Sequence, residues 1–216
     1  MGVLIFVNGE LEGGAWIRPF LVDAAAIIAA NGGTQHLHTL NVLPHIVIGD
    51  LDSLPLATKT WLETADTRFI PHPRDKDETD MELALLYAAE QYPDASIAVF
   101  GALGGRLDQE IANILLLAHP ALRGREVTLV TRSQTARLID EYTSPALIQG
   151  QVGDTVSLLP LGGDVRVRQT TGLRWELQDD ILRFGPARGV SNEMTNTKAT
   201  VVVAAGKLLC VHLRRL

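Results

Sequence analysis

Residues 97–109 read Ile-Ala-Val-Phe-Gly-Ala-Leu-Gly-Gly-Arg-Leu-Asp-Gln, and this stretch decides the fold. The apolar run 97–100 predicts a short strand that is buried on both faces. The glycines after it allow close approach of the backbone to a ligand, and Leu107 begins an apolar repeat, continued at Ile111, Ile114 and Leu115, that is typical of a helix. A buried strand, a glycine loop and a helix form the repeating unit of a doubly wound sheet.

The same alternation extends over the first part of the chain. Thr79 and Glu82 have the spacing of a capping box, and Met81, Leu85 and Ala88 then share one face of a second predicted helix. We therefore predict an α/β domain over residues 1–135, with a doubly wound, mainly parallel sheet and helices on both faces. Its other strands are predicted at 3–7, 26–29, 46–48, 68–70 and 127–130.

The helical period disappears after about Thr135. Short apolar runs, separated by Gly, Asp, Asn or Pro, occur at 155–159, 165–167, 181–184 and 200–203. Such spacing predicts a second, all-β domain over residues 136–216, folded as a small sandwich.

Composition excludes several classes of function. The formal net charge of -6, with no block of Lys or Arg, argues against nucleic acid as a partner. No apolar run approaches the ~20 residues that span a bilayer, and no basic segment precedes the apolar N-terminus, so we expect no membrane anchor, no signal peptide and a cytoplasmic location. The single cysteine, Cys210, lies among alternating apolar residues and is predicted to be a small core residue.

Carboxylates collect where the predicted strands end. Asp50 and Asp52 follow the third strand at alternate positions, so in an extended segment they point the same way, and Asp80 lies after the fourth strand. In an open α/β sheet ligands bind beyond the carboxyl ends of the strands, and Mg²⁺ prefers carboxylate oxygens together with substrate phosphates. The alternative is that residues 50–53 merely cap a turn.

The glycine loop after the fifth strand has the properties of a phosphate site. Gly101, Gly104 and Gly105 permit close backbone approach, and the positive end of the helix from Leu107 attracts an anion. Arg106 adds a charged donor, whereas Asp108 has two readings, as a helix N-cap or as a site carboxylate. The histidines lack metal-ligand spacing and no nucleophile elbow occurs, so positioning plus a metal is favoured over covalent catalysis.

These motifs resemble, in order and spacing, those of the thiamine pyrophosphokinase family. The resemblance rests on residues 49–53, Thr79-Asp80 and 104–109, and continues with the Gly-Leu-x-Trp segment at 171–177 and the Ser-Asn motif at 189–193. It covers nearly the whole chain. One departure is Asn31, which stands where the family usually has an aspartate; an asparagine can accept a hydrogen bond but adds no negative charge.

The resemblance implies a homodimer in which thiamine binds between the domains of opposite subunits. It implies that Asp50, Asp52 and Asp80 hold Mg²⁺ and the ATP phosphates, and that these residues and Asp108 are the catalytic set. Trp175, read alone, is more typical of a core aromatic, but the resemblance makes it a stacking platform for a thiamine ring. The predicted thiamine-binding residues are Gln109, Trp175, Ser191 and Asn192. The predicted ATP- and phosphate-binding residues are Asn31, Gly32, Ser53, Thr79, Gly104, Gly105 and Arg106.

The activity that follows is pyrophosphate transfer from ATP to the hydroxyl group of thiamine. Two alternatives remain at this point: a pyrophosphokinase for another heterocyclic alcohol, such as a hydroxymethylpterin, or a non-catalytic nucleotide-binding regulator. The intact set of Asp50, Asp52, Asp80 and Arg106 argues against the regulator.

Overall fold

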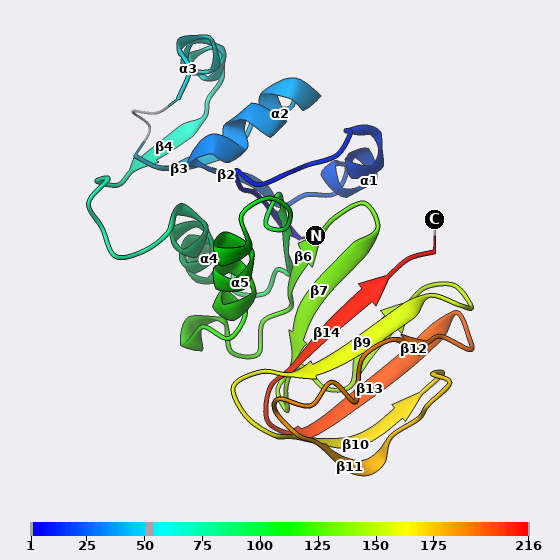
Figure 1. The fold of residues 1–216 in the computed structure, drawn as a ribbon. Helices are drawn as coiled ribbons and strands as arrows, with labels where there is room; N and C mark the ends of the chain where they lie inside the picture. Colours follow the sequence, from blue (N-terminus) through cyan, green and yellow to red (C-terminus); the bar gives the residue numbers. More distant parts are fainter. Residues whose placement is uncertain (1, 51–53, 216) are drawn as a thin grey trace. The chain divides into compact units, whose positions relative to one another are not determined.

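The computed structural model describes residues 2–50 and 54–215. The chain forms two compact units, Met1–Arg132 and Ser133–Leu216 (Figure 1). The boundary predicted from sequence, between residues 135 and 136, falls close to this division. Within the described ranges, no helix is both long and apolar enough to cross a membrane.

Unit 1 is built on a parallel sheet with the strand order β6-β5-β1-β2-β3-β4. The chain passes outward from β1 to β4 and then returns to the other side of β1 as β5, so the direction of winding switches between β1 and β5. This arrangement confirms the predicted doubly wound sheet. The strands are β1 (Val3–Phe6), β2 (Ala26–Ala30), β3 (Ile46–Gly49), β4 (Arg68–Pro71), β5 (Ile97–Phe100) and β6 (Val127–Val130).

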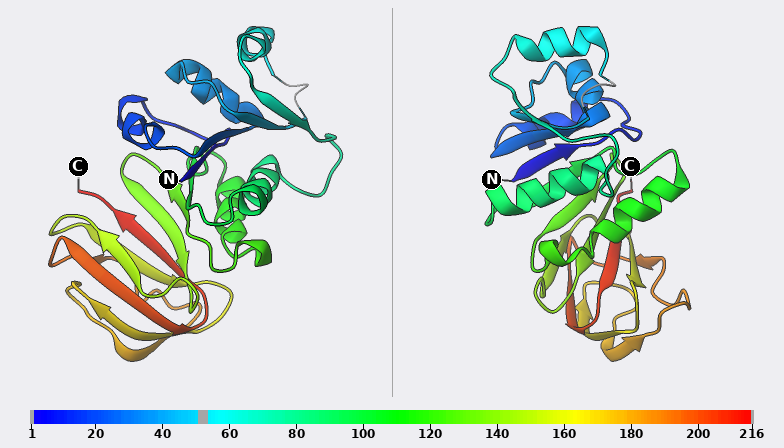
Figure 2. Two further views of the ribbon diagram at one scale, coloured as in Figure 1. Left: turned by 180° about the vertical axis from the view of Figure 1, so that it is seen from behind. Right: turned by 90° about the vertical axis from the view of Figure 1, so that its left-hand side faces the viewer.

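Helices cover both faces of this sheet (Figure 2). On one face, Leu4 and Phe6 of β1 pack with Leu37 and Leu62, which come from α2 and α3. Val3 and Ile5 alternate with them and are equally buried toward the face that carries α4 and α5. The helical segments are η1 (Ala15–Ile17), α1 (Arg18–Leu21), η2 (Asn31–Gly33), α2 (Thr34–Leu40), α3 (Leu56–Glu63), α4 (Asp80–Gln91), α5 (Leu107–Leu116) and η3 (Pro120–Leu122).

The two predicted helices differ in how they meet the sheet. Thr79 is the N-cap of α4, and its side chain accepts a hydrogen bond from the Glu82 N–H at 3.1 Å, while the predicted apolar face is buried. In α5 most of the apolar repeat is exposed, and the buried position is Asn113. The Asn113 amide donates to the Ala102 carbonyl at 2.8 Å, so a polar residue ties α5 to the loop after β5.

Unit 2 consists of two antiparallel sheets, ordered β12-β9-β14-β7 and β11-β10-β13-β8. Alternate residues of both sheets enclose one apolar core, as the predicted sandwich requires. Cys210 belongs to this core, and burial raises the pKa of its thiol to about 11. The strands are β7 (Gln134–Ile139), β8 (Ala146–Gln149), β9 (Thr155–Pro160), β10 (Val165–Thr171), β11 (Gln178–Leu182), β12 (Asn192–Glu193), β13 (Lys198–Ala205) and β14 (Leu208–Leu213).

A buried carboxylate joins the end of unit 2 to a turn. Asp154 is 2% exposed, and its oxygens accept hydrogen bonds from the Gln151 N–H, the Arg215 N–H and Nε2 of His212, at 2.9, 2.8 and 2.9 Å. Burial opposes ionisation of this carboxyl, but the hydrogen bonds from Arg215, Gln151 and His212 outweigh it and lower the pKa of Asp154. The ionised form is therefore part of the folded state.

We expect Asp154→Asn to destabilise unit 2 by about 2 kcal/mol or more, because an amide group cannot accept from three buried donors. A lowered pKa in the folded state adds stability above the unfolded value of about 3.9, and this contribution is lost as the pH falls through the folded value. The wild type should therefore lose stability below about pH 4 more steeply than the variant. Urea unfolding across that range measures both effects.

Asp179→Asn is the matched control, because Asp179 is an exposed carboxylate that pairs with Arg166 at 2.8 Å. This change should alter the free energy of unfolding by less than about 1 kcal/mol. Equal effects of the two substitutions would contradict the structural role of Asp154.

Candidate active site

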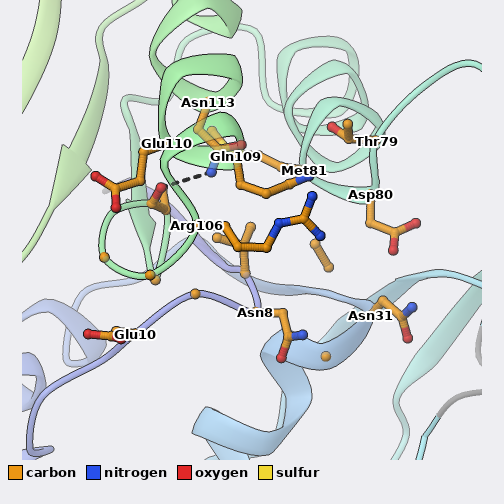
Figure 3. Close-up of a pocket in the computed structure, with 18 residues that line it drawn as sticks. Asn8, Glu10, Asn31, Thr79, Asp80, Met81, Arg106, Gln109, Glu110 and Asn113 are labelled. Atoms are coloured by element: carbon orange, nitrogen blue, oxygen red, sulfur yellow. Dashed lines mark hydrogen bonds between the residues drawn. The ribbon is translucent and has the colours of Figure 1, made fainter.

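A pocket of about 550 Å³ lies in unit 1 at the carboxyl ends of β1, β2 and β5, where α4 and α5 begin (Figure 3). This is the switch point of the sheet, the place where open α/β folds bind ligands. Several residues predicted from sequence line it, among them Asn31, Gly32, Thr79, Asp80, Gly104, Gly105, Arg106 and Gln109.

Two glycines bring the loops after β1 and β5 into backbone contact. The Gly9 N–H donates to the Gly101 carbonyl at 2.8 Å, and a Cβ on Gly9 would lie 2.2 Å from that oxygen. Gly101 has φ +73, and a Cβ there would lie 2.5 Å from the Val7 carbonyl oxygen. No side chain fits between these loops, so the pocket is lined there by main chain.

Polar side chains gather around Gly49, beside the pocket residues Asn31 and Asp80, whereas Gly49 and Asp50 do not line the pocket. Nδ2 of Asn31 donates to Oδ1 of Asp50 at 2.7 Å. A Cβ on Gly49 would lie 2.8 Å from Cβ of Asn31 and 3.2 Å from Oδ1 of Asp80, so Asp80 comes close to the same point. The structure thus brings together the predicted residues Asn31, Asp50 and Asp80. An aspartate at position 31 would face Asp50 as a like charge, whereas the asparagine donates a hydrogen bond to it.

Asp80 is paired with a lysine that the sequence reasoning did not single out. Nζ of Lys76 lies 2.9 Å from Oδ1 of Asp80 and 3.2 Å from the Pro73 carbonyl, and the lysine side chain is only 12% exposed. This Oδ1 is buried and accepts no well-aligned hydrogen bond within the described part of the chain. Lys76 precedes α4, which begins at Asp80, so the two residues do not share a helix and helical spacing does not identify the pair from sequence.

Arg106 and Gln109 extend into the pocket from the beginning of α5 (Figure 3). Arg106 donates from Nε and Nη2 to the Asp108 carboxylate at 3.1 and 2.5 Å. That hydrogen-bonded pair lowers the pKa of Asp108 and raises the pKa of Arg106. Asp108 lies beside the pocket rather than in its lining, and the N-cap of α5 is Arg106, not Asp108. A catalytic role for Asp108 stays a prediction, and its observed contact is with Arg106.

Other pocket residues were not assigned from sequence. Asn8 and Glu10 follow β1 directly, Glu110 and Asn113 come from α5, and Met81 from α4. Glu10 packs on the glycine loop, since a Cβ on Gly104 would lie 3.0 Å from Cβ of Glu10. Asn8 and Glu10 lie in the loop after β1, as Asp50 lies after β3, and their place just beyond the end of a strand was the available signal.

The predicted thiamine residues of unit 2 form a second group. Trp175 is 56% exposed, which excludes the core alternative, and its main chain is hydrogen bonded to the side chain of Asn192. Ser191 adjoins them and donates its N–H to Oγ of Ser157 at 3.1 Å. Asp52 and Ser53, also predicted site residues, lie outside the described residues. Among the residues that are described, no three His, Cys, Asp or Glu side chains form a metal-binding group.

A pocket at the switch point of an α/β unit, followed in the chain by a β-sandwich unit, defines a two-domain class of α/β proteins. Two family models match the chain: the catalytic domain of thiamin pyrophosphokinase at residues 17–129 and its vitamin B1 binding domain at residues 146–208. The chain belongs to the thiamin pyrophosphokinase family.

Individual relatives agree with this membership. The chain is 27% identical over 187 residues to thiamine pyrophosphokinase of Bacillus subtilis, covering 86% of each protein. It is 29% identical over 168 residues to thiamine pyrophosphokinase 3 of Oryza sativa, covering 75% of this chain and 62% of the longer rice protein.

Solved structures share the fold. The crystal structure of thiamine pyrophosphokinase from Bacillus subtilis aligns with a TM-score of 0.87 at 22% identity, covering 100% of both chains. The structure of the enzyme from Geobacillus thermodenitrificans aligns with a TM-score of 0.82 at 26% identity, covering 100% of this chain and 98% of the other.

The contact between the β1 and β5 loops leads to a prediction for Gly101. Gly101→Ala combines an unfavourable positive φ with a clash against the Val7 carbonyl, so we expect it to destabilise unit 1 by more than about 2 kcal/mol. Gly105→Ala is the matched control, because Gly105 has φ +104 but its Cβ would meet nothing nearer than 3.9 Å. Thermal unfolding of both variants measures the difference, and equal losses would show that the close contact has no cost.

Proposed function

We propose that this protein transfers pyrophosphate from ATP to thiamine, giving thiamine diphosphate and AMP. The observation that carries the proposal is the pairing of a pocket at the switch point of unit 1 with matches to both the catalytic and the vitamin B1 binding domains of one family. The relatives named above are thiamine pyrophosphokinases, and no observation favours a pterin substrate or a regulator.

Mg²⁺ is part of the proposal, and the donors around Gly49 fit it. Asp50 and Asp80 supply carboxylate oxygens, and the buried Oδ1 of Asp80 has an ion-pair partner but no well-aligned hydrogen bond. Mg²⁺ is usually held by one or two carboxylates plus substrate phosphates, so these residues would hold it. When bound, it neutralises charge on the phosphate oxygens.

Groups in and beside the pocket have different roles in the proposed reaction. Arg106 donates charge-assisted hydrogen bonds to phosphate oxygens, and its pairing with Asp108 limits the directions in which the guanidinium points. Lys76 fixes the orientation of Asp80. The glycine loop and the start of α5 offer backbone N–H groups to the anion. In-line attack of the thiamine hydroxyl on the β-phosphorus releases AMP, and positioning supplies most of the acceleration.

The proposed thiamine platform is Trp175. Its exposed indole can stack on the flat aminopyrimidine or attract the positively charged thiazolium, an interaction worth roughly 0.5–2 kcal/mol. The cytoplasmic location expected from sequence stays a prediction.

The function is tested by AMP formation from ATP. The protein should release AMP with thiamine and Mg²⁺ present, and much less with a hydroxymethylpterin or with no acceptor. Asp50→Asn should lower turnover by at least ~10²-fold, because a lost carboxylate weakens charge stabilisation of the transferring group.

Asp77→Asn is the matched control for Asp50→Asn, since Asp77 is an exposed carboxylate outside the pocket. Turnover by this variant should equal that of the wild type. Equal rates of AMP release with and without thiamine would reject the proposed function. Normal turnover by Asp50→Asn at moderate Mg²⁺ would reject only the metal assignment.

A homodimer with composite sites is the last part of the proposal. One supporting observation is the apolar stripe of α5, where Leu107, Ile111 and Leu115 are 72%, 49% and 53% exposed. Exposed apolar stripes are typical of surfaces that bind another protein.

We expect a mixture of Asp50→Asn and Trp175→Ala proteins to be more active than either variant alone. In a mixed dimer, one site would combine an intact Asp50 from one chain with an intact Trp175 from the other. Activity is measured after subunit exchange, which is monitored independently by mass. If exchange occurs without recovery, each site is built within a single chain.

A further inference from the structure

Trp175 is held by a short antiparallel pairing with β12. Leu173 and Met194 form a β-bridge, and the Arg174 N–H donates to the Glu193 carbonyl at 2.9 Å. Trp175 follows this pairing and lies opposite Asn192. Ser191, the residue before Asn192, has φ +61, a left-handed conformation.

The side chain of Asn192 hydrogen bonds both main-chain polar groups of Trp175. Its Oδ1 accepts from the Trp175 N–H at 3.1 Å, and its Nδ2 donates to the Trp175 carbonyl at 2.7 Å. The same Oδ1 accepts from the Glu193 N–H at 2.9 Å. Both lone pairs of Oδ1 and one of the two N–H donors are therefore used within the chain.

Asn192 and Trp175 differ in how much of each residue is exposed to solvent. Asn192 is 9% exposed, whereas Trp175 is 56% exposed, so a buried amide fixes the main chain of a residue whose ring faces solvent. The neighbouring residues, Arg174 and Glu193, form a second contact of this kind at the surface. Arg174 lies over the indole at 5.0 Å and is itself bound by the Glu193 carboxylate at 3.1 Å. Consecutive residues of β12 thus hold consecutive residues of the segment that carries the indole.

We propose that Asn192 is a positioning residue for Trp175, and that it acts on thiamine through the indole rather than by direct contact. The proposal rests on the proposed function. A platform that is already ordered binds its ligand without the entropic cost of immobilising a mobile side chain. Loss of the Asn192 amide should therefore weaken thiamine binding while leaving the chemistry at the phosphates unchanged.

A double-mutant cycle with Asn192→Ala and Trp175→Ala tests this. Asn192→Ala should raise the thiamine KM by about ten-fold, leave the ATP KM within about two-fold, and add little to the effect of Trp175→Ala, because both changes remove one interaction. If the two effects multiply, Asn192 contacts thiamine independently of Trp175 and the proposal is overturned.

A second measurement needs no activity. The chain has three tryptophans, and 5-fluorotryptophan labelling gives each a ¹⁹F signal, with that of Trp175 assigned by Trp175→Phe. In Asn192→Ala protein the Trp175 signal should sharpen as the ring gains mobility, while the other two stay unchanged. An unaltered Trp175 signal would overturn the proposal even if the protein proved to act on another substrate.

Two further variants distinguish the loss of the Asn192 hydrogen bonds from general misfolding of unit 2. Asn192→Asp keeps the shape and the acceptor for the Trp175 N–H but loses the donor to its carbonyl, so its effects should lie between wild type and Asn192→Ala. Thr143→Val removes a part-buried hydroxyl that accepts a hydrogen bond from the Asp140 N–H at 3.0 Å, in a turn of the same unit. Thr143→Val should lower stability without raising the thiamine KM. An equal KM change in this control would mean that general loosening of unit 2 explains the result and would overturn the positioning role.

Discussion

The hydrogen bond from the Gly9 N–H to the Gly101 carbonyl is the contact on which the pocket depends. It joins the loops after β1 and β5 at the switch point, where helices leave toward opposite faces of the sheet. Because both residues lack a side chain, the loops meet main chain to main chain. Main chain occupies the positions where side chains would begin, so the wall of the pocket is made of main chain at this point. The contact that joins the two loops of the fold therefore also shapes the pocket.

The polar and charged side chains near this contact between the two loops are arranged in local pairs. Asn31 donates to Asp50, Lys76 neutralises Asp80, and Arg106 is matched by Asp108. Carboxylates that would repel one another are kept close together by these partners. The asparagine at position 31 fits this pattern, because it supplies a donor where the family's usual aspartate would add a further negative charge. A protein with a formal net charge of -6 can in this way present both cationic donors and carboxylates to a polyanionic substrate.

Unit 2 uses buried polar side chains for a different purpose. Asp154 accepts from donors in a turn, in β14 and in the chain after it, and the side chain of Asn192 binds the main chain of Trp175. A buried polar group is costly unless it is hydrogen bonded, so each of these side chains specifies one local conformation. The apolar core stabilises the sandwich, and the polar groups fix where an exposed residue such as Trp175 is placed.

The sequence by itself determined the class of fold, the strands of the parallel sheet, the capped helix α4 and the family. These features depend on local information: apolar periods, capping spacing, and motifs that lie within a few residues of a strand end. Tertiary structure alone decided that Lys76 lies against Asp80, that Asp108 pairs with Arg106 beside the pocket, and that Glu10 packs on the glycine loop. It also decided that the amide of Asn192 binds the main chain of Trp175, from which it is separated by 17 positions. Such contacts depend on the distances and directions between side chains that pairing and packing bring together, and a pattern along the chain does not contain those quantities.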